Sequence, residues 1–367
     1  IQSANARGPG PHTIAFSIAK VTLTANLPTI LVPVTIDGGG SRTEIVGGPG
    51  PGPGAFGSII LGSTSGTSTV KNLVIGYMSG AGIAIVDGGK TVQNCRIGTD
   101  TTGTIAHPNS GAGITVTTTA LGPYPVPAPP PVQPPDISGV LPTLVGDPSD
   151  AAKGNLISGN QGLGVDISGE RTVKVTVANN LIGTDAAGTA AIPNGLGGVK
   201  IVGNSFANTI GPGNVISGNA SPVADGIAIG GKVWEPNVVK GNIVGPAKDL
   251  STNLGHWRTA IVVDSTRYDP KYPEQVATIG PGNVLGHALE DGVSITGGCE
   301  KVQLFGNFIG LAPDPNNSSV FVEMGNGRDG VRIGTSGVSP TDPTTNGHLI
   351  GGTTAQDRNV ISSNGTT

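Results

Sequence analysis

The sequence predicts an all-β chain folded as a right-handed parallel β-helix, a solenoid in which each turn of the chain stacks on the turn before it. Two recurring phrases and one periodicity lead to this prediction. The phrase NLISGN at residues 155–160 returns as NVISGN at 214–219 and, in degraded form, at 283–286 and 359–364. Such recurrence at a spacing of tens of residues indicates a repeat architecture.

The second phrase, Gly-Val-x-Ile, begins at residue 164 and has counterparts at residues 82–85, 226–229, 292–295 and 330–333. Within each phrase the apolar residues lie two apart, which is typical of a strand with one buried face, and the bounding Gly and Asn tolerate tight bends. No stretch shows sustained apolar spacings of three and four. The sequence therefore predicts short strands and almost no helix beyond the first few residues.

Equivalent phrases are expected to stack in parallel, because each returns in the same direction after about two further strands. Ladders about 4.8 Å apart would place Ile and Val in one continuous core. Asn residues at matching positions of successive coils would stack their amides and satisfy buried polar groups. Parallel crossovers take the right-handed sense. At roughly 25 to 35 residues per turn, the chain forms about ten to twelve coils.

A single β-helix domain is expected over residues 1–367, with a cap-like start at 1–20 and two loop insertions. The first insertion, at 121–142, is rich in proline and should form a stiff polyproline II loop. It is either a tolerated surface insertion or an arm that docks on a neighbouring subunit or wall component. The second insertion, at 234–275, is rich in aromatic residues.

The second insertion is the predicted contact site for a carbohydrate or a partner protein. Flat aromatic rings stack on sugar faces, and arginine pairs with acids. The alternative is that the loop uses its Trp and Tyr residues as a small core of its own. The candidate contact residues are Trp234, His256, Trp257, Arg258, Asp264, Tyr268 and Tyr272.

Acidic residues recur beside the Gly-Val-x-Ile phrases. Stacked coils could align them, and aligned carboxylates can bind calcium or serve as an acid and base pair. Turn chemistry is the favoured interpretation, because the nonapeptide of calcium-binding β-rolls is missing; no cofactor is expected, with calcium as the alternative. Asp100 and Asp185 are likewise interpreted as bend residues. The aligned candidates are Asp166, Asp225, Asp291 and Asp329.

Composition favours a secreted structural chain. Glycine (62) and proline (30) are abundant among 367 residues, whereas charged residues make up 12% and aromatic residues 3%. The net charge of −4 provides no basic footprint, so no nucleic-acid partner is expected, and no apolar run is long enough to span a bilayer. Cys95 and Cys299 lie several coils apart, too far for a disulfide, and are expected to be free and buried.

The opening of the chain carries a resemblance to a known family. Residues 1–6 (IQSANA), 10–16 (GPHTIAF), 27–28 (LP) and 33–38 (PVTIDG) are similar to the start of bacterial surface β-helix proteins of the CSLREA-domain type. These are related to polymorphic outer-membrane and pectate-lyase-like repeats. The Cys-Ser-Leu-Arg-Glu-Ala stretch of that family is missing, so the chain looks trimmed at its N-terminus. The resemblance implies a solenoid at an extracellular or cell-surface location, and no single activity.

The leading hypothesis is a non-catalytic extracellular structural or adhesive protein: a stalk, an adhesin or a filament subunit. Polygalacturonase and pectate-lyase motifs are missing, and residues 269–272 (DPKY) match the Asp-Pro-His-Asp of alginate epimerases only in part. Residues 359–367 begin a further coil without a polar cap. Copies of the chain are therefore expected to stack end to end, and a cell-surface or wall glycan or protein is the other expected partner.

The alternative hypothesis is a polysaccharide-active enzyme, a lyase or glycoside hydrolase of the pectate-lyase-like superfamily. In this reading Trp257 and Tyr268 stack on sugar rings, and Asp264 or Asp225 acts as acid or base.

Overall fold

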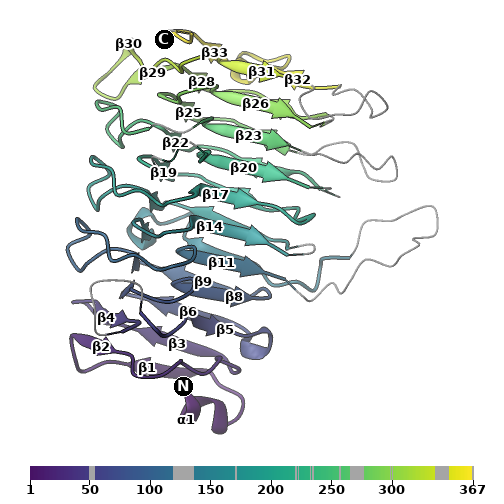
Figure 1. Ribbon diagram of the computed structural model, residues 1–367. Coiled ribbons are helices and arrows are strands. Elements are labelled where there is room, and N and C mark those ends of the chain that lie inside the picture. The colour runs from purple at the N-terminus through teal and green to yellow at the C-terminus, as the bar shows by residue number, and fades with distance from the viewer. Residues whose placement is uncertain are drawn as a thin grey trace.

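The computed structural model describes residues 1–48, 54–118, 136–169, 172–219, 221, 223–231, 233, 235–255, 258–264, 277–297, 299, 301–334 and 347–365. The chain is a right-handed parallel β-helix, as the sequence predicts, and Figure 1 shows its coils stacked from the purple N-terminal end to the yellow C-terminal end. Three parallel sheets, called A, B and C below, run the length of the stack.

Sheet A contains β1 (His12–Ala15), β3 (Val34–Asp37), β6 (Ser68–Lys71), β9 (Lys90–Gln93), β12 (Thr143–Gly146), β15 (Val175–Ala178), β18 (Thr209–Ile210), β21 (Asn237–Val239), β24 (Ala277–Ile279), β27 (Gln303–Leu304) and β32 (Leu349–Ile350). Sheet B contains β2 (Lys20–Thr22), β4 (Thr43–Val46), β7 (Leu73–Gly76), β10 (Arg96–Ile97), β13 (Leu156–Ile157), β16 (Leu181–Ile182), β19 (Val215–Ile216), β22 (Ile243–Val244), β25 (Val284–Leu285), β28 (Phe308–Ile309) and β33 (Val360–Ile361).

Sheet C contains β5 (Ile59–Leu61), β8 (Ile83–Val86), β11 (Ile114–Thr117), β14 (Leu163–Ser168), β17 (Gly197–Ile201), β20 (Ile227–Gly230), β23 (Ile261–Asp264), β26 (Val293–Thr296) and β31 (Val331–Ile333). Among the described residues, an antiparallel hairpin and four short helices lie outside these sheets. The hairpin strands are β29 (Leu311–Asp314) and β30 (Asn317–Glu323). The helices are α1 (Gln2–Ala6), η1 (Ser63–Ser65), η2 (Ala151–Lys153) and η3 (Ala355–Asp357).

The coil count agrees with the sequence estimate, because the described residues place eleven strands in each of sheets A and B. The core also follows the predicted alternation. In β8, Ile83 and Ile85 are buried and Ala84 between them is half-buried; Ile83 pairs with Ile114 of the next coil. Parallel pairing in register stacks like residues along the axis, so the β-branched side chains form a continuous core.

Two long rows of stacked asparagines confirm the predicted amide ladders. In each row the side-chain Nδ2 donates to the Oδ1 of the asparagine one coil further on, over 2.8–3.1 Å. These hydrogen bonds satisfy amides that are largely buried at the bends. The first row is Asn155, Asn180, Asn214, Asn242, Asn283, Asn307 and Asn359, and the second is Asn109, Asn160, Asn194 and Asn219.

Asp100 and Asp185 act as bend residues, as predicted. The Asp100 carboxylate accepts hydrogen bonds from the backbone N–H groups of Thr104 and Ile105, and Asp185 accepts two in the same way one repeat later. Burial by itself would raise the pKa of Asp100. Hydrogen bonds from Thr102, Ile105 and Thr104 outweigh burial and lower that pKa to about 2.

Cys95 and Cys299 are both buried and form no disulfide, in agreement with the sequence prediction. Burial raises the pKa of the Cys95 thiol to about 12, so this side chain behaves as a small core residue. In the described ranges, no helix has the length and apolar character needed to cross a bilayer.

Most of the first predicted insertion, 121–142, lies outside the described residues, namely residues 121–135. Within the second predicted insertion, 234–275, the strands β21, β22 and β23 continue sheets A, B and C in register. Residues 234, 256–257 and 265–275 of that insertion lie outside the described residues.

Candidate functional site

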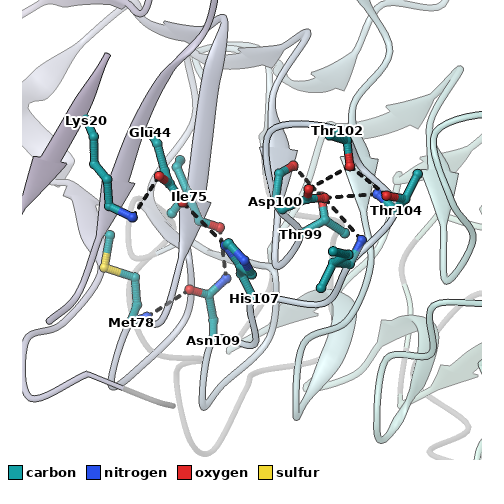
Figure 2. Close-up of polar contacts among 11 residues, drawn as sticks. Lys20, Glu44, Ile75, Met78, Thr99, Asp100, Thr102, Thr104, His107 and Asn109 are labelled. Atoms are coloured by element: carbon teal, nitrogen blue, oxygen red, sulfur yellow. Dashed lines mark hydrogen bonds and ion pairs between the residues drawn. The ribbon is translucent and has the colours of Figure 1, made fainter. Parts of the chain in front are cut away.

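Four titratable side chains gather near the N-terminal end of sheet B. Lys20 on β2 and Glu44 on β4 are partners in the strand register, and Lys20 Nζ lies 2.9 Å from Glu44 Oε2. The other carboxylate oxygen, Oε1, lies 3.3 Å from His107 Nδ1, and Figure 2 shows the three side chains directed toward one another. The Tyr77 ring stacks on the His107 ring, with centroids 4.6 Å apart and planes inclined by 26°.

The hairpin that follows β10 positions His107. Thr99 and Ala106 form an antiparallel bridge, and the backbone N–H of His107 donates to the Gly98 carbonyl over 2.8 Å. The returning chain then lies against Gly76 at the end of β7. A Cβ at Gly76 would come within 2.8 Å of the Cβ and carbonyl oxygen of His107, so this close approach requires glycine.

Asn109 holds the same segment in place through its side-chain amide. Its Oδ1 accepts a hydrogen bond from the Met78 backbone N–H over 3.0 Å, and its Nδ2 donates to the Ile75 carbonyl and to Asn160 Oδ1. Figure 2 shows the contacts to Met78 and Ile75 beside His107. The asparagine row of the fold thus holds the loop that carries the imidazole.

Glu44 and His107 are largely enclosed, with 10% and 21% of their side chains exposed. The buried Nδ1 of His107 has no aligned hydrogen bond, although Glu44 Oε1 lies 3.3 Å away. The contact is therefore a close approach of carboxylate and imidazole at the distance of an ion pair. Burial, and then the charge of Glu44, raise the pKa of Tyr77, so its phenol remains protonated at neutral pH.

A groove of about 400 Å³ lies on the outer side of sheet B, between β10 and β19. Arg42, Arg96 and Lys248 line it, and none of its described lining residues is acidic. Arg42 donates from Nε to the Asn94 carbonyl over 3.2 Å. Burial and the nearby charge of Arg42 lower the pKa of Arg96. The groove is cationic although the whole chain is acidic.

Lys20, Glu44, Tyr77 and His107 are called the acid–base cluster below. The groove and this cluster lie on the same face of the solenoid, the outer side of sheet B. Glu44, Val74 and Arg96 occupy one register row on successive strands of sheet B. Strand spacing puts Arg96 about 9.6 Å beyond Glu44 along the axis. The side chains of Lys20, Glu44 and Arg96 therefore belong to one row on the same face of the solenoid.

The structure places only two of the seven sequence-predicted contact residues. Arg258 and Asp264 both line a trough of about 440 Å³ on sheet C, away from the cluster on sheet B. A second hollow of about 200 Å³ adjoins it, and the two share Arg258, Val262 and Asp264. The other five, Trp234, His256, Trp257, Tyr268 and Tyr272, lie outside the described residues.

Asp225 is held by Arg258, with Oδ2 at 2.8 Å from Nη2 and Oδ1 at 3.3 Å from Nε. Burial raises the pKa of Asp225, and the bond from Arg258 opposes that shift. Burial likewise raises the pKa of Asp166. Asp291 and Asp329 are neighbours on successive coils, since Asp291 Oδ1 accepts the Asp329 backbone N–H over 3.2 Å. Among the described residues, no group of three His, Cys, Asp or Glu could hold a metal ion.

The sequence motifs did not indicate Lys20, Glu44, Tyr77 or His107, because these residues come from separate segments. The repeat itself contains one signal that points to His107. The segments 97–109 and 182–194 are copies, and His107 stands where the second copy has Ile192. A histidine at a position that is otherwise apolar departs from the repeat pattern, and such departures identify residues that the fold itself does not require.

No family model and no curated protein matches this chain. Two solved structures resemble it, both A-modules of mannuronan C-5 epimerases from Azotobacter vinelandii. The AlgE6 module is 13% identical, with 99% of this chain and 92% of that chain covered and a TM-score of 0.38. The AlgE4 module is 11% identical, with 99% and 93% covered and a TM-score of 0.33. The likeness concerns the β-helix architecture alone, and the resemblance to CSLREA-type surface proteins remains an expectation.

Proposed function

We propose that this chain is a polysaccharide-active enzyme that binds an acidic polysaccharide along sheet B and transfers a proton at a sugar carbon beside a carboxylate. The observation that carries the proposal is the Glu44–His107 contact of 3.3 Å, stacked on Tyr77 and located on the same face as the cationic groove. We favour this function over the non-catalytic structural hypothesis, which rested on sequence motifs and did not include these residues.

In the proposed reaction His107 is the base. Glu44 would stabilise the imidazolium formed when the ring takes the proton from the carbon beside the sugar carboxylate. Lys20, whose side chain is half-exposed, and the arginines of the groove would offset the negative charge that develops on that carboxylate. Tyr77 would then give its proton to the glycosidic oxygen as the C–O bond on the neighbouring carbon breaks.

This set of residues favours a lyase over a glycoside hydrolase. Most glycoside hydrolases place two carboxylates on either side of the scissile bond. The sheet B cluster offers one carboxylate, Glu44, together with an imidazole and a phenol. Elimination needs a base, a proton donor and charge neutralisation, and the cluster and groove supply all three.

The test is turnover of a panel of acidic and neutral polysaccharides, followed by the ultraviolet absorbance of the unsaturated product. The wild-type chain should release this product from an acidic polysaccharide. His107→Asn should lower kcat about 100-fold or more, because the base is removed. Lys240→Gln, an exposed change directly after β21 of sheet A, is the matched control and should leave kcat unchanged. A folded wild-type chain that turns over no acidic polysaccharide would refute the proposal.

The proposal keeps the extracellular or cell-surface location expected from composition, because acidic polysaccharides are wall and matrix polymers. End-to-end association of copies is compatible with this activity, since both the cluster and the groove lie on the side of the coils. Electron microscopy of the native protein would show whether filaments form.

A further inference from the structure

The trough on sheet C has an alternating pattern of charge. Arg258, Glu290 and Arg328 occupy consecutive coils, because the Glu290 backbone N–H donates to the Arg258 carbonyl and the Arg328 backbone N–H donates to the Glu290 carbonyl. Positive, negative and positive side chains thus follow one another along the axis. The two arginines are separated by two coils, about 9.6 Å at the usual strand spacing.

Buried carboxylates fix these guanidiniums. The Arg258 and Arg328 side chains are 46% and 44% exposed, whereas Asp225 and Asp291 beneath them are 9% and 2% exposed. Arg328 Nη2 lies 2.8 Å from Glu290 Oε2 and 3.4 Å from Asp291 Oδ2. A guanidinium has five N–H donors, so each arginine keeps donors for a ligand after binding its acid. The pairs therefore present oriented donors whose mobility is already restricted.

The shape of the trough suits a long ligand. Its two adjoining hollows run from Lys200 on β17 to Arg332 on β31, across strands that Figure 1 shows stacked along the axis. The floor between them is the register row of Ala228, Val262 and Ser294, small or medium side chains without charge. A ligand that follows this floor lies parallel to the axis of the β-helix.

We propose that this trough binds an extended, ribbon-like polysaccharide carrying one carboxylate per disaccharide, with its chain parallel to the β-helix axis. A two-fold ribbon presents the same edge once per disaccharide, a repeat close to two coils of this solenoid. Successive carboxylates would meet Arg258 and Arg328, and Glu290 between them would accept hydrogen bonds from sugar hydroxyls. This second site lies on another sheet from the acid–base cluster and does not depend on the proposed reaction.

The test uses an octasaccharide of alternating β-linked glucuronate and N-acetylglucosamine, and its methyl ester as a matched probe. Isothermal titration of the full chain should show binding of the acid, and binding about tenfold or more weaker for the ester, because esterification removes only the charge. Arg258→Gln and Arg328→Gln should each weaken binding of the acid about tenfold, with Lys240→Gln as the unchanged control.

Removal of Arg258 leaves buried Asp225 without its partner, so the fold of each variant is checked by thermal unfolding. Ala228→Phe provides an independent test, because it obstructs the floor and leaves every ion pair in place; it should also abolish binding of the acid. Equal affinity for acid and ester, or affinity that survives both Arg328→Gln and Ala228→Phe, would overturn the proposal. The measurement is affinity, so failure of the proposed reaction would appear in the turnover assay and not here.

Discussion

At the scale of single residues, the enclosed pair of Glu44 and His107 distinguishes one face of this solenoid from the others. Glu44 Oε1 lies 3.3 Å from His107 Nδ1, and the stacked phenol of Tyr77 restricts the plane of the imidazole ring. Lys20 Nζ lies 2.9 Å from the other carboxylate oxygen of Glu44. The proposed reaction depends on this arrangement of four side chains, and two substitutions test it directly.

Replacing Glu44 by Gln should lower kcat about tenfold while leaving KM within a factor of about two, because the neutral amide no longer stabilises the imidazolium. Steady-state kinetics on the acidic polysaccharide identified in the panel would measure both constants. Lys71→Gln, which removes a surface partner of Asp37, serves as the control. A change in KM alone would contradict the assigned role of Glu44.

Tyr77 should control the alkaline limit of activity. A phenol that acts as a proton donor is active only while protonated, so the rate should fall as pH rises through its pKa. Burial and Glu44 raise that pKa above 10.0, so the decline should begin above the ordinary range of tyrosine. The pH profile of kcat measures this limit. Tyr77→Phe should leave a low rate whose profile lacks the alkaline limb, and a profile identical to wild type would exclude Tyr77 as the donor.

At the scale of elements, hairpin turns and asparagine rows hold the strands in register. The turn at 99–106 depends on one carboxylate, and the copy at 184–191 depends on another. The asparagine rows satisfy the backbone where the chain bends between sheets. The asparagines of the first row recur on every coil, and the turn recurs two coils later, so the contribution of each can be tested at one copy and compared with the next.

Asp100→Ala should destabilise the chain by about 1–2 kcal/mol at pH 7, because it removes hydrogen bonds from two backbone N–H groups. The pKa of Asp100 is depressed, so its contribution is present above the unfolded value of 3.8 and is lost as pH falls through about 2. Urea unfolding across this pH range would measure the difference between variant and wild type. Asp100→Asn keeps an acceptor and should cost less; a constant difference down to pH 2 would argue against this explanation.

Asn214→Ala in the middle of the first row should cost about 2–4 kcal/mol of unfolding free energy. It removes the side-chain bonds to Asn180 and Asn242 and leaves the buried backbone N–H of Asn180 without its acceptor. Asn359→Ala, in a half-buried part of the same row, is the matched comparison and should cost less. Equal costs at both positions would show that burial does not set the contribution of the row.

These elements were predictable from the sequence because each repeat phrase carries its own structural reason. Alternating Ile and Val predict a half-buried strand, a recurring Asn predicts a bend whose amide stacks on that of the next coil, and Asp100 predicts a turn. The acid–base cluster was not predictable in the same way. Lys20, Glu44, Tyr77 and His107 meet only after four segments are placed in one register, and the phrases determine that register without referring to these side chains. His107 could still have been noticed as a departure from its copy, Ile192.

At the scale of the whole molecule, each coil contacts mainly the coils on either side. Such a solenoid should tolerate removal of one complete repeat, because the flanking coils present matching surfaces. Leu181 and Val215 are register partners, and Asn180 and Asn214 precede them in the same row. Joining residue 180 directly to residue 215 therefore preserves both the strand pairing and the amide contact.

A chain lacking residues 181–214 should fold as a shorter β-helix, with a lower Tm and unchanged circular dichroism per residue. Its acid–base cluster remains complete, but the cationic groove loses Leu181, Ala186 and Gly213 from its lining. KM for the acidic polysaccharide should therefore rise by more than about threefold while kcat changes little. Removal of residues 181–213, one residue fewer, shifts the register and should prevent folding. Equal behaviour of the two deletions would contradict the role of register.

The asparagine rows also give the solenoid an electrical direction. Each amide in the first row from Asn155 to Asn307 donates toward the coil that follows it, so these side-chain dipoles point the same way along the axis. Aligned dipoles in a buried row polarise one another and add, as peptide dipoles do along an α-helix. A β-helix built in this way is a polar rod. Any row of amides that extends it must keep the same donor-to-acceptor order, so growth of the stack is compatible with only one orientation of the added coil.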